Sequence, residues 1–549
     1  MELMDKIILK KTETVFIVEN LMLKNNGILN SILRKMRFMY EELGYKTTLL
    51  VCNYAATLLQ VNVILKSDNS KIKSANLSQD ANIIGLFYYF QKSFKDNIEE
   101  IEYNLTLDEG ETKEEISPKV YKIYKDGAHI RTEHFTGLDY RLRMIDKFSD
   151  GKHTKTIFYD DTGTLSMIRI YDKDNDKFFP EEYYYTTDKW LRFKAEYEYL
   201  EKQGDFRQNY RLINLYFYDE DGQVIETFHS IGELTAYFLN IYCSDPQKMY
   251  LLVDESGKLT DAQLRVNKAN IFKTCIVHNT FLANSYDLTS APQSYYRHLC
   301  EHRNEFDAIV FLTMTERTDF LKKYRDYDRR RVFVIPHPYA FPIERRPFEE
   351  REKKAVVIAR YDPSKQLEHA IKIFKLVIKK IPEAKLEIYG FGLEEENLKK
   401  LIIELELEES VILKGTTLEP LEVFSKSLFS MMTSHVEGMP LTLLESIMNG
   451  CPAFAYNLNY GPAEIIIDNA TGYLIPRNDM VAFAKKIIEY WNNETLQKKM
   501  SANCYDDEQR FSVEKFLRNW MNFMESLYEL RRERIVAETQ NENREAAYA

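Results

Sequence analysis

TSHVEGMPLTLLESIMNG, residues 433–450, predicts the turn from a buried strand into a helix. The residues just before it, 428–433 (LFSMMT), are almost wholly apolar, as in a parallel strand that is buried on both faces. Pro440 suits the first turn of the helix that follows. The turn would therefore direct free backbone N–H groups and the positive end of a helix dipole at a ligand, and phosphate is the usual one.

Two carboxylates belong to the same stretch. Glu437 lies in the turn, and Glu445 lies about two helical turns further on, so both can reach one ligand. A carboxylate accepts two hydrogen bonds and suits paired sugar hydroxyls, while the N–H groups would hold a diphosphate. This combination suits a sugar nucleotide. The alternative is that Glu437 caps the helix and Glu445 is an ordinary solvated helix residue.

Strands and helices alternate on both sides of this stretch. The expected strands are 355–359, 385–389, 411–413 and 452–456, and the expected helices are 367–380, 393–405, 479–490 and 495–502. This alternation is typical of a Rossmann-like domain with a parallel sheet.

Two cations flank the strand-to-helix turn at residues 360–365. Arg360 follows directly at the end of strand 355–359 and Lys365 precedes helix 367–380, so both side chains can reach one anion above the sheet. Either could instead be a surface charge, which is the usual position of a lone Lys or Arg. Their place at the carboxyl end of a parallel strand favours a ligand.

The N-terminal part of the chain opens in the same way. Its expected elements are strand 15–18, a helix that ends at Leu43, strand 47–52 and, after residue 230, strands 249–253, 274–277, 308–312 and 331–335. Gly27, before the first helix, would let the backbone approach a ligand, although an isolated glycine is more often a turn residue. His278 follows strand 274–277, where it could donate to a donor-sugar hydroxyl or phosphate or be a satisfied loop histidine.

Between these parts, residues 103–228 change to short aromatic strands separated by turn signals such as Asp126-Gly127 and Asp150-Gly151. This pattern predicts an antiparallel meander of hairpins. Residues 172–174 (DKD) and 219–221 (DED) have the form of a metal-binding DxD motif. Because both fall in hairpin turns, where aspartate is expected for turn chemistry, we interpret them as turns. The tyrosine-rich faces are interpreted as packing and assembly surface.

The expected fold class is therefore α/β, with two Rossmann-like domains that face a cleft and an antiparallel β-meander domain inserted in the first. The expected divisions are 1–95 (first Rossmann-like part), 96–235 (meander), 236–345 (second Rossmann-like part), 346–511 (donor-binding domain) and 512–549 (crossover helix and polar tail). The last helix is expected over 513–530, with a frayed tail from residue 531 to the end.

Composition excludes several classes of function. The 549 residues carry a net charge of −11, which argues against general nucleic-acid binding. The six cysteines form no CxxC pair and no cluster at zinc spacing. The first residues lack the apolar core of a signal peptide, and no run is long enough to span a membrane. We therefore expect a cytoplasmic protein, with the inner face of the membrane as an alternative location.

Four segments stand in the order and spacing of a known group: 359–365 (ARYDPSK), 389–392 (YGFG), 437–441 (EGMPL) and 460–464 (YGPAE). With them the chain resembles bacterial retaining GT-B glycosyltransferases of family 4 that carry a β-meander insert. This group includes wall teichoic acid α-glycosyltransferases and enzymes that glycosylate serine-rich or Ser-Asp-repeat surface adhesins. The resemblance covers nearly the whole chain.

The resemblance implies roles for individual residues. Arg360 and Lys365 would hold the diphosphate of UDP, Glu445 the ribose hydroxyls, and Glu437 the donor-sugar hydroxyls. The catalytic residues of this chain would be Glu437, His278, Arg360 and Lys365. The residues that bind the donor would be Gly27, Arg360, Lys365, Gly390, Gly438, Met439, Pro440, Leu441 and Glu445. No metal or cofactor is required, since the UDP-sugar is a substrate. Two departures are Asn26-Gly27, where relatives have a glycine pair, and Gln366, where many have glycine.

The expected function is that of a UDP-sugar-dependent retaining α-hexosyltransferase. It would move glucose or N-acetylglucosamine to hydroxyls of a cell-wall polymer, poly(glycerol/ribitol phosphate) wall teichoic acid. One alternative acceptor is a serine-rich or Ser-Asp-repeat adhesin, and another function is that of a non-catalytic partner subunit in a glycosyltransferase complex. The meander is the expected surface for a homo-oligomer or a partner subunit.

Overall fold

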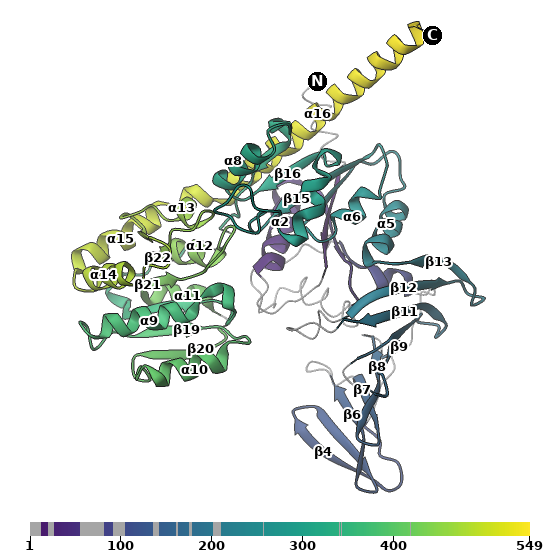
Figure 1. Ribbon diagram of the computed structural model, residues 1–549, viewed down its shortest axis with the longest axis horizontal. Coiled ribbons are helices and arrows are strands. Elements are labelled where there is room, and N and C mark those ends of the chain that lie inside the picture. Colours follow the sequence, from purple (N-terminus) through teal and green to yellow (C-terminus); the bar gives the residue numbers. More distant parts are fainter. Residues whose placement is uncertain are drawn as a thin grey trace.

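The computed structural model describes residues 12–19, 27–54, 82–91, 105–135, 142–160, 163–174, 178–200, 210–255, 257–339, 341, 343–417 and 419–548. Within these residues the chain forms two parallel sheets and one antiparallel sheet (Figure 1). The antiparallel sheet is inserted in the part of the chain that builds the first parallel sheet. This arrangement confirms the predicted fold class.

The N-terminal parallel sheet has seven strands in the order β17-β16-β15-β14-β1-β2-β3. They are β1 (Glu13–Val18), β2 (Lys46–Val51), β3 (Asn82–Gly85), β14 (Tyr250–Asp254), β15 (Ile271–Val277), β16 (Ala308–Phe311) and β17 (Val332–Val334). Its helices are α2 (Gly27–Leu43), α4 (Leu86–Gln91), α5 (Ile231–Tyr242), α6 (Thr260–Leu264), α7 (Arg297–Glu301) and α8 (Met314–Lys323). The short turns η3 (Ser294–Tyr296), η4 (Arg303–Glu305) and η5 (Arg329–Arg331) connect them.

Helix α2 follows the predicted pattern. Ile32, Leu33, Met36 and Met39 recur at helical spacing and are buried in the core. The helix ends before Gly44, which has a φ of +68° and therefore favours glycine.

The antiparallel sheet is a ten-stranded meander in which each strand pairs with its neighbour in sequence. Its strands are β4 (Glu111–Ser117), β5 (Val120–Lys125), β6 (Ala128–Phe135), β7 (Leu142–Ser149), β8 (Lys152–Tyr159), β9 (Leu165–Ile170), β10 (Glu181–Tyr185), β11 (Leu191–Tyr199), β12 (Tyr210–Tyr218) and β13 (Val224–Phe228). The Asp219 carboxylate accepts the N–H groups of Asp221 and Gln223 at 3.1 and 2.8 Å, which is turn chemistry as predicted.

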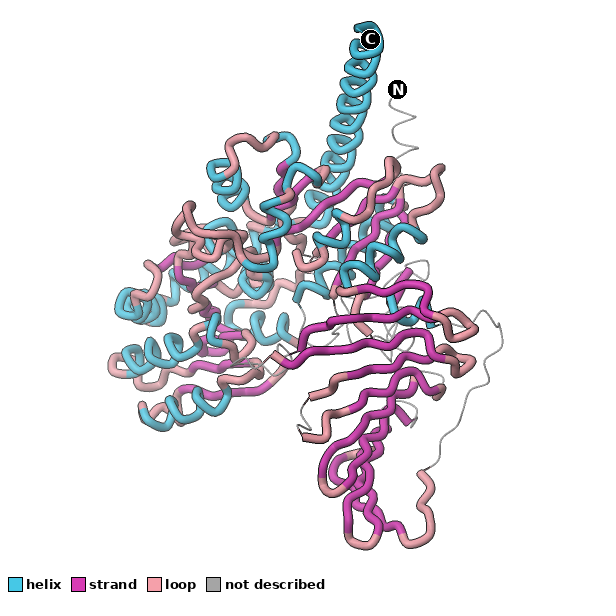
Figure 2. The backbone as a smooth tube through the Cα atoms, turned by 45° about the vertical axis from the view of Figure 1, so that its right-hand side comes forward, coloured by secondary structure: helices cyan, strands magenta, loops and turns pink. Residues whose placement is uncertain are grey.

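Aromatic side chains join the meander to the N-terminal sheet. Phe87 of α4 stacks on Tyr184 with ring centroids 4.7 Å apart, and Phe90 of the same helix meets Phe193 and Phe217 edge to face. These rings belong to one buried cluster that also includes residues of β1 and β14. Figure 2 shows the other end of the sheet extending away from the two parallel domains. On the inner part of the meander the aromatic residues are therefore packing residues.

The C-terminal sheet has six parallel strands in the order β20-β19-β18-β21-β22-β23. They are β18 (Glu352–Ile358), β19 (Leu386–Tyr389), β20 (Val411–Gly415), β21 (Ser427–Met432), β22 (Ala453–Tyr456) and β23 (Gly472–Ile475). The helices are α9 (Leu367–Ile378), α10 (Glu395–Glu404), α11 (Pro420–Lys426), α12 (Leu441–Met448), α13 (Pro462–Ile465), α14 (Met480–Trp491) and α15 (Glu494–Asp506). The short turns are η6 (Phe348–Glu350), η7 (Pro363–Lys365) and η8 (Glu508–Phe511). The domain divisions proposed from the sequence stay a prediction.

The last helix, α16, runs from Val513 to Tyr548, so the prediction of a frayed tail after residue 530 is wrong. Trp520 and Phe523 of α16 contact Phe16 and Phe333 of the N-terminal sheet. Arg531 then donates to the carbonyl oxygen of Ala269 at 2.7 Å, and this contact helps the helix continue past residue 530. The final part of α16 projects from the body of the molecule (Figure 1).

Candidate active site

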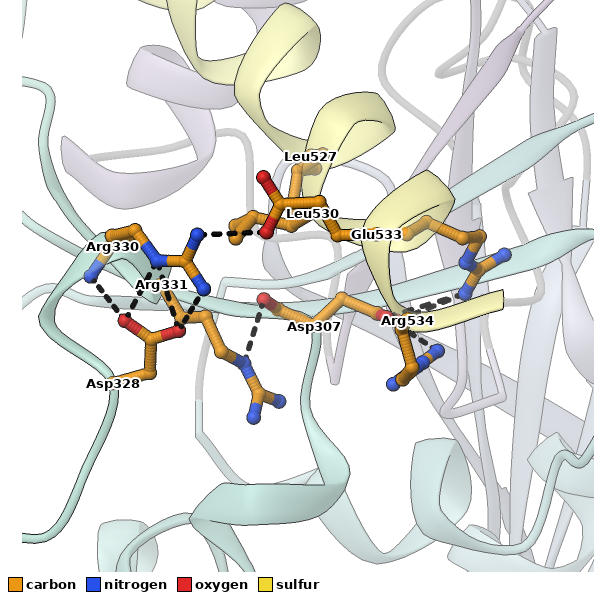
Figure 3. Close-up of a pocket in the computed structure, with 9 residues that line it drawn as sticks. Asp307, Asp328, Arg330, Arg331, Leu527, Leu530, Glu533 and Arg534 are labelled. Carbon is orange, nitrogen blue, oxygen red and sulfur yellow. Dashed lines mark hydrogen bonds and ion pairs between the residues drawn. The ribbon is translucent and has the colours of Figure 1, made fainter. Parts of the chain in front are cut away.

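A pocket of about 320 Å³ lies between α16 and the segments that precede β16 and β17 (Figure 3). It is lined by Asp307, Asp328, Arg330, Arg331, Leu527, Leu530, Arg531, Glu533 and Arg534. Arg330 pairs with Asp328 and Glu533, so its charge is already balanced. Because Asp307 directly precedes β16, this pocket lies at the amino end of the sheet. Parallel α/β sheets bind ligands at the carboxyl end, where His278 follows β15.

The turn between β21 and α12 has the predicted strand-to-helix form. Pro440 is the residue before α12, and no side chain caps the helix. In the described part of the chain, no protein acceptor is found for the backbone N–H groups of Gly438, Met439 and Leu441. These N–H groups and the helix dipole are therefore available to an anion.

Gly438 lies against the other domain. A Cβ atom at this position would come within 2.1 Å of the carbonyl oxygen of His278. Gly461 supports the same turn, because its φ is +92° and a Cβ there would lie 2.3 Å from the carbonyl oxygen of Gly438. Glycine at 438 is thus required by the approach of the two parallel domains, a reason that the sequence alone did not reveal.

Glu437 and Lys365 meet in the same turn. The Lys365 Nζ atom donates to Glu437 Oε1 at 2.7 Å, and the two side chains are only 19% and 13% exposed. Arg360 is exposed and lies 3.5 Å from Asp362. Burial would raise the pKa of Asp362, but hydrogen bonds from Ser364 and the charges of Arg360 and Lys365 hold it below its usual value. Both predicted cations therefore act on one carboxylate beside β18.

Gln366, the departure noted in the sequence, has a left-handed backbone with φ +46° and ψ +47°. This conformation favours glycine. The Gln366 Oε1 atom is also buried with no hydrogen-bond partner among the described residues. The sequence therefore accepts both strain and an unpaired oxygen next to Lys365.

We predict that Gln366→Gly stabilises the protein by about 1 kcal/mol, because glycine relieves the left-handed strain and removes the unpaired oxygen. Chemical unfolding followed by circular dichroism measures the change. Gln366→Ala is the matched control, since alanine removes the oxygen but keeps the strain. A glycine variant no more stable than the alanine variant would show that the backbone at 366 is not strained.

Glu445 lies in α12 with its side chain 13% exposed, and it faces Arg34 of α2 across the two domains. The Arg34 Nη2 atom lies 3.9 Å from Glu445 Oε1, and its guanidinium carbon lies 4.1 Å above the Phe341 ring. Burial raises the pKa of Glu445, against the opposing charge of Arg34. The Nε atom of Arg34 is buried without a partner among the described residues. Sequence reasoning missed Arg34 because α2 reads as an ordinary amphipathic helix.

His278 lies in a buried network rather than in a solvent-exposed loop. Its Nε2 atom contacts Glu255, and Glu255 in turn accepts from Lys35 Nζ at 3.0 Å. The His278 ring stacks on His337 with centroids 5.3 Å apart. Burial lowers the pKa of both histidines. The sequence singled out His278 but none of these three partners.

Further contacts hold the carboxyl ends of the two parallel sheets against each other. The Glu464 carboxylate accepts the N–H groups of Met314 and Thr315, at the start of α8, at 2.7 and 2.8 Å. Asn459 Nδ2 donates to the carbonyl oxygen of Ser285 at 2.6 Å. The predicted donor-site residues on the C-terminal sheet therefore face the N-terminal domain.

The two remaining predicted glycines have different outcomes. Gly27 is the first residue of α2, and the preceding loop with Asn26 lies outside the described residues. Gly390 has a φ of +151°, and a Cβ there would lie 1.8 Å from the carbonyl oxygen of Ala359. Gly390 is thus needed to pack the ends of β18 and β19, and its contact with a donor stays a prediction.

One group of side chains in the described ranges has the spacing of a metal site. Ligand atoms of His298, Glu301 and His302 lie within 4.8 Å of one another, and all three residues are exposed. None of them is a predicted donor-site residue. Separately, no helix in the described part of the chain is long and apolar enough to cross a membrane.

Comparison with known proteins identifies similar chains. The family model described as "Glycosyl transferases group 1" matches residues 341–507. The chain is 28% identical over 398 residues to a poly(glycerol-phosphate) alpha-glucosyltransferase of Bacillus subtilis, a match that covers 72% of this chain and 57% of that relative. It is 26% identical over 412 residues to a poly(ribitol-phosphate) alpha-N-acetylglucosaminyltransferase of Staphylococcus aureus, covering 75% and 74%.

Among solved structures, a TarM variant of S. aureus in complex with Fondaparinux, alpha-GlcNAc-glycerol and UDP superimposes with a TM-score of 0.75. The identity is 21%, and the match covers 93% of this chain and 99% of that one. At this identity the likeness shows the fold, which includes the inserted antiparallel sheet and both parallel domains.

Proposed function

Because this chain belongs to the group 1 glycosyl transferases with the GT-B fold, we propose that it is a retaining hexosyltransferase that uses a UDP-sugar. The observation that supports this most directly is the turn at residues 437–441. There, unpaired backbone N–H groups adjoin a lysine–glutamate pair at the carboxyl end of a parallel sheet. Such a turn offers one site for phosphate and another for hydroxyls.

The N–H groups of Gly438 and Met439, in the turn before α12, and of Leu441, its first residue, would bind the diphosphate together with Lys365 and Arg360. Glu437, freed from Lys365 by the phosphate, would accept the hydroxyls of the donor sugar. Glu445, in the middle of α12, would accept the ribose hydroxyls. The Arg34 guanidinium would then leave Glu445 and contact either the ligand or only the Phe341 ring.

The difficult step is the departure of UDP from a sugar that develops oxocarbenium character. Cations and a helix dipole aimed at the leaving phosphate stabilise the charge that forms there, and this term is usually the largest in such reactions. Among the residues that the structure describes, we assign no second carboxylate as a nucleophile. The acceptor hydroxyl would therefore attack from the face that UDP leaves, and its proton would pass to the departing phosphate, with retention at the anomeric carbon.

For the acceptor we propose a poly(glycerol phosphate) or poly(ribitol phosphate) chain, because both relatives compared above are named for such polymers. The match spans 57% of the first relative, and the substrate of this chain is therefore part of the proposal. A serine-rich peptide is the alternative acceptor. We place the reaction in the cytoplasm, where UDP-sugars are made, and we propose the meander as the surface for self-association or a partner subunit.

The test is acceptor-dependent release of UDP by the purified full-length chain. UDP-glucose and UDP-N-acetylglucosamine are each combined with poly(glycerol phosphate), poly(ribitol phosphate) and a serine-rich peptide, and the anomeric configuration of the product is read by NMR. We expect release of UDP with one donor and a polyol phosphate, giving an α-linked product.

Turnover on the peptide alone would replace the proposed acceptor with a protein. Absence of turnover with every pair, together with failure to bind UDP in calorimetry, would overturn the proposal in favour of a non-catalytic partner subunit. The Glu437→Ala variant is the negative control, since full turnover in that variant would contradict the role of Glu437.

A further inference from the structure

Three charged or titratable side chains from distant parts of the sequence form a buried line behind the donor site. Lys35 of α2 donates to both carboxylate oxygens of Glu255, at 3.0 and 3.1 Å, and Glu255 contacts His278 Nε2. The side chains of Lys35, Glu255 and His278 are 3%, 0% and 5% exposed. The line therefore ends at the one predicted catalytic residue that the N-terminal sheet contributes.

Stability alone does not explain this line. Removing an ammonium and a carboxylate from water costs several kcal/mol per ion, and apolar side chains of similar size are often as stable or more so. A chain selected only for a firm core would place such apolar residues at 35 and 255. The pair is therefore better explained by what it does to His278.

The charges of the pair determine the state of the imidazole. Burial would raise the pKa of Glu255, but Lys35 and His278 hold it below its usual value, so Glu255 is a carboxylate at neutral pH. Burial lowers the pKa of His278, so its ring is neutral. A neutral ring beside a carboxylate directs its N–H at the carboxylate, and Nε2 is the nitrogen that contacts Glu255.

We propose that Lys35 and Glu255 are positioning residues that hold His278 as the Nε2–H tautomer, so that its Nδ1 atom accepts a hydrogen bond from a hydroxyl of the donor sugar. This rests on the proposed function. It reverses the direction expected from the sequence, in which His278 donates to the sugar or phosphate. No hydrogen bond to Nδ1 is found in the described ranges, so this nitrogen is the one left for a ligand.

Glu255 and Lys35 have different effects on His278. Glu255 fixes the tautomer and the ring plane, as carboxylates do for functional histidines elsewhere. Lys35 balances the carboxylate, which by itself would favour a charged imidazole. The His337 ring lies against the His278 ring, and the backbone N–H of His278 donates to the Tyr296 hydroxyl at 2.9 Å, so ring and backbone are both anchored. The charged groups that face the ring are thus Glu255 and Lys35, with His337 and, beyond it, Arg34.

The direct test is the tautomer of His278. In the full-length chain labelled with ¹⁵N-histidine, the His278 ring signals are those absent from His278→Gln. We expect the shift pattern of a neutral ring protonated at Nε2. The Lys35→Met/Glu255→Leu double variant removes both charges together, so it leaves no lone buried ion, and should show a mixture of tautomers. A ring protonated at Nδ1 in the wild type, or an unchanged pattern in the double variant, would overturn the inference.

Kinetics add a readout that a purely structural role would not change. The double variant should keep its UDP affinity within about twofold while kcat falls by about 10- to 100-fold, as for other partners that orient a functional histidine. In Lys35→Met the unbalanced Glu255 raises the histidine pKa, so the acid limb of kcat/KM should move to higher pH. An acid limb that does not move, or full kcat in the double variant, would contradict the assignment.

The two proposals fail in distinguishable ways. A wild-type chain that binds no UDP and turns over no UDP-sugar would refute the proposed function, whatever the tautomer. A wild-type chain that turns over UDP-sugar with His278 protonated at Nδ1 would refute only the positioning role of Lys35 and Glu255.

Discussion

Replacing Lys365 with methionine is expected to lower kcat by about 10²- to 10³-fold, the range seen when one preorganised group that stabilises developing charge is removed. The Nζ atom is the half-buried cation next to the turn, at 2.7 Å from Glu437, and methionine keeps the length of the side chain without its charge. As UDP leaves, its phosphate gains negative charge. In the methionine variant this charge would be stabilised by the N–H groups of the turn and the exposed Arg360, without Lys365. Initial rates with a saturating UDP-sugar measure the change.

Lys380→Met is the matched control, because Lys380 is exposed just past α9 and carries the same charge. It should leave kcat within about twofold, as for most surface substitutions away from a site. The Lys365→Met/Glu437→Gln double variant adds a further check. If both residues act on one bound donor, its loss should be smaller than the product of the two single losses. A Lys365→Met enzyme with wild-type kcat would remove Lys365 from the catalytic groups.

The parts of the site that were predictable from the sequence are those whose signal is local. The turn at residues 437–441 could be predicted because a buried strand, a glycine and a helix-starting proline follow one another there. Arg360 and Lys365 could be placed because they flank a single strand-to-helix turn. The fold class followed from the alternation of strands and helices and from the change to hairpins between residues 103 and 228.

The missed residues act through contacts that sequence spacing does not contain. Lys35 and Glu255 are 220 positions apart, and each alone resembles a solvated charge. Arg34 becomes a candidate site residue only through its contact with Glu445 in the other domain. The reach of α16 past residue 530 depends on Asp307 and the carbonyl of Ala269, since the polar sequence RRERIVAETQ has no apolar stripe that would predict it. In each case the role of the residue depends on its contact partner, and that partner is distant in the sequence.

Gly438→Ala is expected to reduce kcat by about 10²-fold, through the domains and not through the phosphate site. The added Cβ would meet the His278 carbonyl oxygen at 2.1 Å; that oxygen belongs to the backbone and the Cβ is held in place by its own backbone, so neither atom can rotate away. The two domains must therefore separate, and a displacement of about 1 Å at a reacting centre can cost 10²-fold in rate. Initial rates at saturating donor and acceptor measure this loss.

The same substitution should leave the affinity for UDP within about threefold, because alanine keeps the backbone N–H and the contacts of UDP proposed here lie on the C-terminal domain apart from Arg34. Calorimetry with UDP therefore separates the effect on domain approach from an effect on the anion site. Loss of UDP affinity equal to the loss of kcat would mean that the glycine serves the phosphate directly. Unchanged kcat would mean that the contact between Gly438 and His278 is absent from the form of the enzyme that reacts. Only a fall in kcat with UDP binding retained fits an active site completed by the approach of His278 to the turn.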